Sequence, residues 1–466
     1  MKEITKKKCE NILLIIPVRN WYSGITIDLG ILYLYSALKR DGIKATMLHC
    51  PKEGMDLDDF KIFLEHNPQI RIIWFKSYSV DHNSIKRMSK IAKEVIPDCT
   101  IIVGGPHPTS IPEYVLKDMI HIDYVSVGEG EIGFPIFCKK ILQKDSVDDV
   151  PWLWFRINGE IKINPNQIYD NLDDLPEICW EDINIEEYPN FMTSLRFVPV
   201  MATRWCPYQC KYCAAHKIVG RRIRYRSVNN VINELKRLKS IGINEINFSD
   251  DELTLNRKYF LELCNGIIDN KLDILWECSN GVRLDTLDDE VLDIMYNAGC
   301  RYVAVGIESS SNQILKDMKK NITTETIIEK LDLIKRHKVI PQWLFMIGFP
   351  NESEQDIKNT IKFSQDLDID KTNFSIFMPL PGSETFDELI ASKEIEIEKI
   401  NRDDMRPDRI ARDRWISAKR LKKLQRMAYL KFYLRPKPMK RFFKEMILDT
   451  KKWKTVMIKL KSILFK

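Results

Sequence analysis

The sequence predicts an α/β protein with an N-terminal flavodoxin-like, doubly wound parallel sheet, a partial (β/α)6 barrel and a helical C-terminal extension. Short apolar runs alternate with amphipathic helical stretches over residues 11–145, and the same alternation restarts at Arg196, as expected when helices cover parallel sheets. Between these two regions the periodicity is lost. The expected boundaries are 1–145 for the first domain, 146–195 for a connector, 196–400 for the barrel and 401–466 for the extension.

The first region reads as five β-α repeats. Its strands are nearly all apolar, as expected when helices cover both faces of a sheet. An amphipathic stretch at Leu29–Arg40 ends before Gly42, a typical helix stop. Five such repeats favour a flavodoxin-like order. The expected strands are Asn11–Val18, Ala45–Cys50, Ile70–Ser77, Thr100–Gly104 and Ile122–Val127.

The second region contains six strand-like runs separated by helical patterns such as Val228–Ser240 and Ile327–His337. Six units are fewer than the eight of a closed barrel, so a partial barrel is expected, with functional groups at the C-terminal ends of its strands. The expected strands are Phe197–Thr203, Ile243–Ser249, Ile274–Ser279, Tyr302–Ile307, Pro341–Ile347 and Asn373–Met378.

The remaining segments carry weaker signals. The connector has an Asn158-Gly159 turn and little sustained periodicity, and the extension lacks strand-like runs.

Ile12–Val18 imitates a signal peptide behind a basic N-terminus, but it is short and lacks a cleavage site, so a buried first strand is expected. No apolar run approaches the roughly 18 residues of a membrane-spanning helix.

Composition indicates a soluble protein in a reducing compartment. The 466 residues are 44% hydrophobic and 30% charged, which suits a globular protein. Eight of the eleven cysteines are scattered in mostly apolar surroundings without paired spacing. Buried, reduced thiols of this kind are typical of cytoplasmic proteins, so a cytoplasmic location is expected.

The other three cysteines form the most informative feature. Cys206, Cys210 and Cys213 have the spacing Cys-x3-Cys-x2-Cys directly after the first expected barrel strand. Three thiolates at this spacing can hold three irons of a [4Fe–4S] cluster and leave the fourth iron open to a small molecule. The alternative is a zinc site completed by His216. The place of the loop at a barrel mouth, and Tyr212 before the last cysteine, favour the cluster.

These residues resemble the radical S-adenosylmethionine (SAM) superfamily, in the subgroup with an N-terminal cobalamin-binding domain. The resemblance covers nearly the whole chain and rests on several motifs together. The matching segments are Asn247–Glu252, Gly306–Ser309, Met346–Pro350, Pro379–Ser383 and Phe432–Pro436, with Val103–Pro108 and Val127–Glu131 upstream.

The resemblance implies roles for residues at the ends of the barrel strands. SAM would bind the open iron and lie near Tyr212. Asp250 or Asp251 would meet its amino group, Glu308 its ribose hydroxyls or amine, and Ile347 and Gly348 its adenine through their backbone. The alternative for each carboxylate is an ordinary capping role after a strand.

In the first domain the resemblance places cobalamin against two glycine-rich loops. The loops follow the fourth and fifth strands, at the edge where doubly wound sheets bind ligands, although ordinary tight turns would also use such glycines. The sequence lacks the Asp-x-His-x-x-Gly motif that supplies a lower cobalt ligand, and His107 is not expected to replace it. The candidate residues are Gly104, Gly105, His107, Gly128, Glu129 and Gly130.

The resemblance implies an enzyme with three cofactors: a [4Fe–4S] cluster, SAM and cobalamin. It favours a methyltransferase that acts on an unactivated carbon of a small-molecule or lipid substrate, with flavodoxin or ferredoxin as electron donor. One alternative is a non-methylating cyclase or rearrangement enzyme, such as the anaerobic ring cyclases. A more distant one is a zinc-binding scaffold protein.

The C-terminal tail is basic. The segment from Lys431 to Lys466 has twelve Lys or Arg residues and two acidic residues, although the whole chain carries only +6. Within it, Lys451–Phe465 alternates basic and bulky apolar residues, which favours either contact with an anionic membrane surface or a helix packed on the barrel. Nucleic acid is not an expected partner, because no recognition module accompanies the charge.

Overall fold

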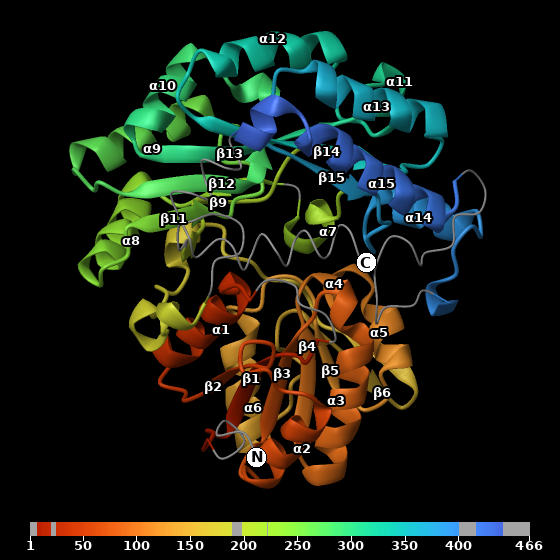
Figure 1. Ribbon diagram of the computed structural model, residues 1–466. Helices are drawn as coiled ribbons and strands as arrows, with labels where there is room; N and C mark the ends of the chain where they lie inside the picture. Colours follow the sequence, from red (N-terminus) through yellow and green to blue (C-terminus); the bar gives the residue numbers. More distant parts are fainter. Residues whose placement is uncertain (1–6, 20–24, 189–197, 221, 400–415, 441–466) are drawn as a thin grey trace.

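The computed structural model describes residues 7–19, 25–188, 198–220, 222–399 and 416–440, which form two lobes (Figure 1). In the first sheet the strands lie in the order β2-β1-β3-β4-β5, with each neighbouring pair parallel. This order is flavodoxin-like, so the predicted fold class is confirmed. The strands are β1 (Ile12–Ile16), β2 (Thr46–His49), β3 (Ile72–Lys76), β4 (Thr100–Gly104) and β5 (Tyr124–Ser126).

Helices cover both faces of this sheet. Side chains of α1 and α6 share one buried cluster with one face, and those of α2, α3 and α5 share another with the opposite face. Helix α1 begins after Asp28, whose side chain accepts a hydrogen bond from the Ile31 backbone N–H and so caps the first turn. The helices are α1 (Leu29–Arg40), α2 (Leu57–Glu65), α3 (His82–Val95), α4 (Pro106–Ser110), α5 (Pro112–Asp118) and α6 (Gly133–Gln143).

The stretch predicted as a connector contributes a hairpin to the first sheet. Strands β6 (Leu153–Ile157) and β7 (Glu160–Ile163) are antiparallel and continue the sheet beyond β5. Asn158 and Gly159 both have positive φ, 50° and 85°, as required by the tight turn that matches strand twist. Because β7 has no buried residue, it lacks the apolar alternation that would reveal a strand in the sequence.

The second sheet has six parallel strands in the order β15-β14-β13-β12-β11-β8. This confirms the predicted partial barrel. A short antiparallel ribbon, β9 (Thr203–Arg204) with β10 (Arg224–Tyr225), flanks the cysteine loop. The sheet strands are β8 (Val198–Val200), β11 (Glu245–Phe248), β12 (Leu275–Val282), β13 (Cys300–Glu308), β14 (Ile340–Ile347) and β15 (Thr372–Ile376).

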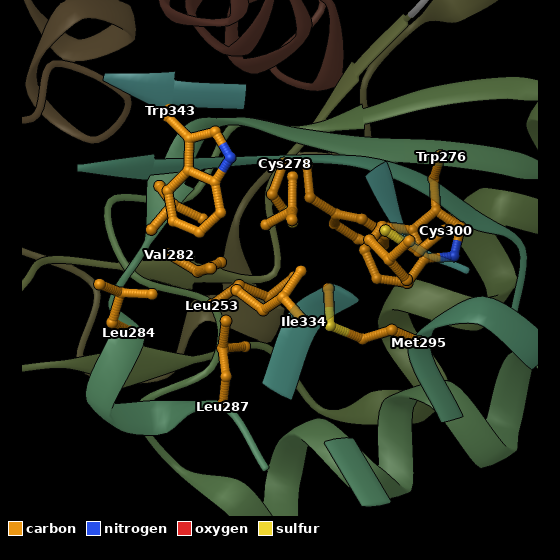
Figure 2. Close-up of a cluster of buried hydrophobic side chains, with 14 of the residues drawn as sticks. Leu253, Trp276, Cys278, Val282, Leu284, Leu287, Met295, Cys300, Ile334 and Trp343 are labelled. Atoms are coloured by element: carbon orange, nitrogen blue, oxygen red, sulfur yellow. The ribbon is translucent and has the colours of Figure 1, made fainter. Parts of the chain in front are cut away.

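Helices cover the outside of the barrel and pack on a continuous apolar core. Figure 2 shows part of this core, where Trp276, Cys278 and Cys300 gather with Met295 and Ile334. The two cysteines are buried thiols, as the sequence predicts. These helices are α8 (Val228–Ser240), α9 (Arg257–Asp269), α10 (Asp289–Asn297), α11 (Asn312–Asp317), α12 (Thr324–Lys335), α13 (Glu354–Asp366) and α14 (Glu384–Ala391). The short helix α7 (Ala215–Val219) instead lies between the two lobes and contacts α4 (Figure 1).

The C-terminal extension closes the outer edge of the barrel. Helix α15 (Ala418–Tyr433) packs on β15 and α13, and the Tyr433 hydroxyl donates a hydrogen bond of 2.7 Å to the Thr372 carbonyl. Within the described ranges, no helix has the length and apolar character needed to cross a membrane. The basic segment Lys451–Phe465 lies outside the described residues.

Candidate active site

A cavity of about 820 Å³ lies where the two lobes face each other. Its first-domain wall includes Ile16 at the end of β1 and Tyr78 after β3. Its barrel wall includes Asn247 on β11, Glu277 on β12 and Gln342 on β14. The cavity therefore joins the ligand-binding edge of a doubly wound sheet to the interior of a partial barrel, the two places where such folds bind ligands.

The cysteine loop lies between β9 and α7. The Cys213 backbone N–H donates to the Cys210 carbonyl at 3.0 Å, and the Cys213 Sγ accepts from the Ala215 N–H at 3.5 Å. Burial raises the pKa of the Cys206 thiol to about 12, and the neighbouring Cys213 adds to this effect. In the described part of the chain no three Cys, His, Asp or Glu side chains are close enough together to hold an ion as placed.

The donor chemistry of this loop fits an iron–sulfur cluster. All three cysteines are partly exposed, unlike the buried structural thiols of the strands. Burial and the charge of the nearby Cys210 thiolate both raise the pKa of the Cys213 thiol, as expected of neighbouring ligands that share a cationic centre. Cys206, Cys210 and Cys213 would thus hold the cluster.

Asp250 and Asp251 follow β11 and face the cysteine loop differently. Asp250 is buried, and its Oδ1 accepts hydrogen bonds from the Ala202 N–H at 3.0 Å and the Thr203 hydroxyl at 2.8 Å. Asp251 is exposed and accepts from the Trp205 N–H, and its charge raises the pKa of the Cys206 thiol. Asp250 therefore supports the start of the cysteine loop, whereas Asp251 faces the loop from the open side.

Glu308 ends β13 in a strained conformation. Its φ of 68° is unusual for a residue with a side chain. Its Oε1 accepts hydrogen bonds of 3.0 Å from both the Tyr212 hydroxyl and the Lys320 ammonium. The structure thus brings Glu308, which was predicted to contact SAM, to the aromatic residue of the cysteine loop, together with Lys320, which no sequence pattern singled out.

Ile347 ends β14 and Gly348 follows it, and a buried carboxylate holds the turn that begins there. Glu352 accepts hydrogen bonds from the Gly348 N–H at 2.5 Å and the Phe349 N–H at 3.2 Å. Burial raises the pKa of Glu352 to about 8. A side chain at Gly348 would lie 2.9 Å from Leu421 of α15, so the extension also fixes this turn.

The glycines of the first-domain loops permit close packing. A Cβ atom at Gly104 would lie 2.7 Å from the Trp74 ring, and one at Gly105 would lie 2.9 Å from the Ser77 carbonyl oxygen. Gly128 has a φ of 86° and donates its N–H to the Thr109 hydroxyl at 2.9 Å. Neighbouring protein atoms therefore account for the need for glycine at these positions.

His107 lies inside the first domain, with both ring nitrogens close to partners. Its Nδ1 is 3.0 Å from the Ser79 hydroxyl and its Nε2 is 2.8 Å from His82 Nδ1. His82 is in turn 2.8 Å from a carboxylate oxygen of Asp118. His107 is 1% exposed, so its side chain supports the loop from inside the domain.

Glu129 has partners in the other lobe. Its carboxylate forms ion pairs with Arg204 at 3.0 Å and with Arg224, and Glu131 pairs with Arg204 at 2.6 Å. Glu129 was predicted from the sequence as a cobalamin contact, whereas neither arginine was predicted. Their position in the chain could have pointed to these arginines, because Arg204 and Arg224 flank the segment that contains the cysteine loop.

Glu277 is a second residue that the sequence analysis missed. It lines the cavity from β12, and burial raises its pKa to about 7 although Lys371 opposes the shift. The other charged lining residues, Arg19, Asp28 and Arg204, all have ion-pair partners. Among the residues the structure describes, Glu277 forms no such pair. A buried carboxyl facing a cavity is a typical ligand contact.

Comparisons with known proteins agree with this geometry. The family model for the radical SAM superfamily matches residues 200–364, and that for the B12 binding domain matches residues 17–137. An uncharacterized methyltransferase of Pyrococcus horikoshii is 33% identical over 352 residues, which cover 75% of this chain and 76% of that protein. The anaerobic magnesium-protoporphyrin IX monomethyl ester cyclase of Rubrivivax gelatinosus is 28% identical over 68% of this chain and 58% of its own length.

Among solved structures, the radical SAM methyltransferase TsrM from Kitasatospora setae has the same fold. With tryptophan substrate and a SAM analogue bound, it superposes with a TM-score of 0.69 at 17% identity, covering 82% of this chain and 76% of TsrM. The order of the two matched domains is the order of the two lobes. The chain belongs to the radical SAM superfamily, among the members that carry a B12-binding domain before the radical SAM domain.

Proposed function

We propose that the protein is a cobalamin-dependent radical SAM enzyme that methylates an unactivated carbon of a small-molecule substrate. The observation that carries this proposal is the cavity of about 820 Å³ shared by the B12-binding domain and the barrel. Its lining includes Tyr78 after β3 and Arg204, two residues before Cys206, so a substrate held there would contact both domains. Such positioning supplies a large part of the catalytic effect in enzymes.

When bound, a [4Fe–4S] cluster supplies the electron that cleaves SAM to a 5′-deoxyadenosyl radical, and cobalamin supplies the methyl group. The chain's own residues position these groups and exclude water. Cys206, Cys210 and Cys213 hold the cluster, and an external reductant of the flavodoxin or ferredoxin kind provides electrons.

The strand ends provide the SAM contacts. Asp251 binds the SAM amino group, because its carboxylate is exposed beside the cysteine loop while Asp250 is engaged with the β8–β9 backbone. Glu308, held by Tyr212 and Lys320, accepts hydrogen bonds from the ribose or the amine. The backbone of Ile347 and Gly348 approaches the adenine, with Glu352 fixing the turn.

The test is anaerobic reconstitution with iron, sulfide, SAM and hydroxocobalamin, followed by mass analysis of small molecules from an extract of the producing cell. We expect bound cobalamin, 5′-deoxyadenosine and a product heavier by one methylene unit. A variant with alanine at all three loop cysteines should lose the cluster and SAM cleavage. Cys179→Ala, which alters a partly exposed cysteine outside the loop, should keep both.

Ring cyclisation is the second candidate, favoured by the similarity to the Rubrivivax cyclase. The two functions share cofactors and differ in product mass, since cyclisation adds no methylene. A preparation that binds no cobalamin and transfers no methyl group would contradict the first proposal. Colourless protein containing one zinc would instead support the scaffold alternative.

A further inference from the structure

A buried network of ion pairs joins the two lobes next to the cysteine loop. Arg204, two residues before Cys206, pairs with both Glu129 and Glu131 of the first domain, at 3.0 and 2.6 Å. Arg224, which lies opposite Arg204 in the β9–β10 ribbon, also pairs with Glu129. All four side chains are at most 8% exposed. This set is called the interlobe network below.

The interlobe network has further anchors on each side. The Arg224 guanidinium donates to the Tyr169 carbonyl at 2.7 Å, and the Arg204 guanidinium lies 5.2 Å from the centre of the Tyr33 ring of α1. Arg204 outweighs the effect of burial and lowers the pKa of Glu131. Glu131 therefore remains charged at neutral pH, and the arginines cannot lose their charge.

The other end of the cysteine loop also meets the first domain. Helix α7 follows Cys213 and contacts α4, which carries His107. The two first-domain loops are themselves joined, because the Gly128 N–H donates to the Thr109 hydroxyl at 2.9 Å. The segment before the cysteine loop thus meets one of the predicted cobalamin loops, and the segment after it meets the other.

Stability alone does not explain such a network. Buried ion pairs often contribute no more than apolar residues of the same size, because desolvation offsets their attraction. A bidentate arginine does fix direction and distance, since its planar guanidinium binds carboxylates in a defined geometry. The interlobe network lies two residues before Cys206 and on either side of Gly130, so it can fix the geometry between the two proposed cofactor sites.

We propose that Arg204, Glu129 and Glu131 are positioning residues that set the cysteine loop at a fixed distance and orientation from the cobalamin-binding loops. This inference rests on the proposed function for the identity of the two cofactors. The contacts themselves belong to the protein alone. Loss of the network should therefore loosen the cysteine loop even before any cofactor binds.

The test uses Glu131→Gln and, as a matched control, Glu234→Gln. Glu234 pairs with Arg226 and is 7% exposed, like Glu131, but both members of that pair belong to the barrel lobe. A second variant, Arg204→Lys, retains the positive charge and loses the fork that bridges two carboxylates. We expect amide hydrogen exchange of residues 205–214 in the cofactor-free protein to accelerate in Glu131→Gln and Arg204→Lys, and to remain as in the wild type in Glu234→Gln.

A spectroscopic measurement follows on the reconstituted enzyme. A reduced cluster speeds the electron spin relaxation of nearby cob(II)alamin, and the effect falls steeply with distance. With iron and cobalt contents equal to wild type, Glu131→Gln should weaken this enhancement and lower methyl transfer about tenfold or more, since small displacements of reacting groups cost that much. Glu234→Gln should leave both unchanged.

The possible outcomes separate this inference from the proposed function. Unchanged exchange of residues 205–214 in Glu131→Gln, or an equal acceleration in Glu234→Gln, would overturn the positioning role whatever the cofactors are. Wild-type protein that binds no cobalamin would contradict the proposed function instead. The exchange experiment would still decide whether the interlobe network holds the loop.

Discussion

At the scale of single residues, the structure distinguishes the surroundings of two neighbouring carboxylates, Asp250 and Asp251, which the sequence alone could not tell apart. Asp250 accepts hydrogen bonds from the β8–β9 backbone, whereas Asp251 is exposed beside the cysteine loop. We predict that Asp251→Asn weakens SAM binding roughly ten- to hundredfold, because it removes a charge-assisted hydrogen bond worth about 1.5–3 kcal/mol. Equilibrium binding of SAM to the reconstituted enzyme measures this. Asp250→Asn is the control and should keep SAM affinity within about twofold of wild type.

Asp250 should instead be visible in the pH dependence of stability. Burial raises its pKa from 3.8 to about 7 despite the hydrogen bonds from Thr203, so the folded protein holds this proton more tightly than the unfolded chain. The stabilisation is complete below about pH 4 and is lost as the pH rises towards 7, at about 1.4 kcal/mol per pH unit.

Asp250→Asn cannot titrate, so its stability relative to wild type should increase between pH 4 and 7. Chemical denaturation of both proteins at several pH values tests this. The comparison must be between the two proteins, because Glu277 and Glu352 have raised pKa values as well. Parallel stability curves for wild type and variant would show that Asp250 is ionised throughout this range.

At the scale of elements, the loop after β5 depends on one glycine. Gly128 has a φ of 86°, and a methyl group there would overlap the Trp152 ring. We predict that Gly128→Ala lowers the free energy of unfolding by about 1–3 kcal/mol more than the same substitution at a turn without close neighbours. It should also impair cobalamin retention while leaving the iron content intact. Thermal unfolding and cobalt analysis measure the two effects.

Gly159 provides the control for backbone strain. Its φ of 85° matches that of Gly128, and a Cβ atom there would meet no atom within 4 Å. Gly159→Ala therefore imposes the same backbone cost without the clash. If both variants lost stability and cobalamin equally, packing against Trp152 would not be what holds the loop.

The elements that the sequence predicted share a strong local signal. Strand Thr100–Gly104 and helices Leu29–Arg40 and Val228–Ser240 have the predicted bounds, because apolar runs and caps mark them directly. The β6–β7 hairpin was missed beyond its turn, since its outer strand has no buried residue. A strand that takes its stability from pairing with a neighbour leaves little trace in its own sequence.

The residues of the candidate site divide in the same way, into those that a local sequence pattern predicts and those that only the folded chain reveals. The cysteine loop and the strand ends follow from spacing and position, so they could be selected in advance. The partners of Glu129 could not, because Arg224 lies 95 residues away along the chain and the contact depends on how two lobes meet. Glu277 was missed for a related reason, since only the assembled barrel shows that its side chain faces a cavity.

At the scale of the whole molecule, helix α1 belongs to both lobes. Ile31, Leu34 and Leu38 pack in the cluster on the first sheet, while Leu32 and Tyr33 join the core of the barrel lobe. In Figure 1, α1 lies at the edge of the first lobe nearest the barrel. A helix shared by two cores links their unfolding, because neither core can lose it alone.

We predict a single cooperative thermal transition for the wild type, which calorimetry can test. Leu32→Ala and Leu34→Ala remove similar buried side chains, 5% and 4% exposed, and each should cost about 2–5 kcal/mol. Leu34→Ala weakens only the first core and should shift the transition as a whole. Leu32→Ala weakens the contact between lobes and should split the transition in two. Equal, unsplit shifts would mean that the lobes are coupled by contacts other than the apolar face of α1, such as the interlobe network.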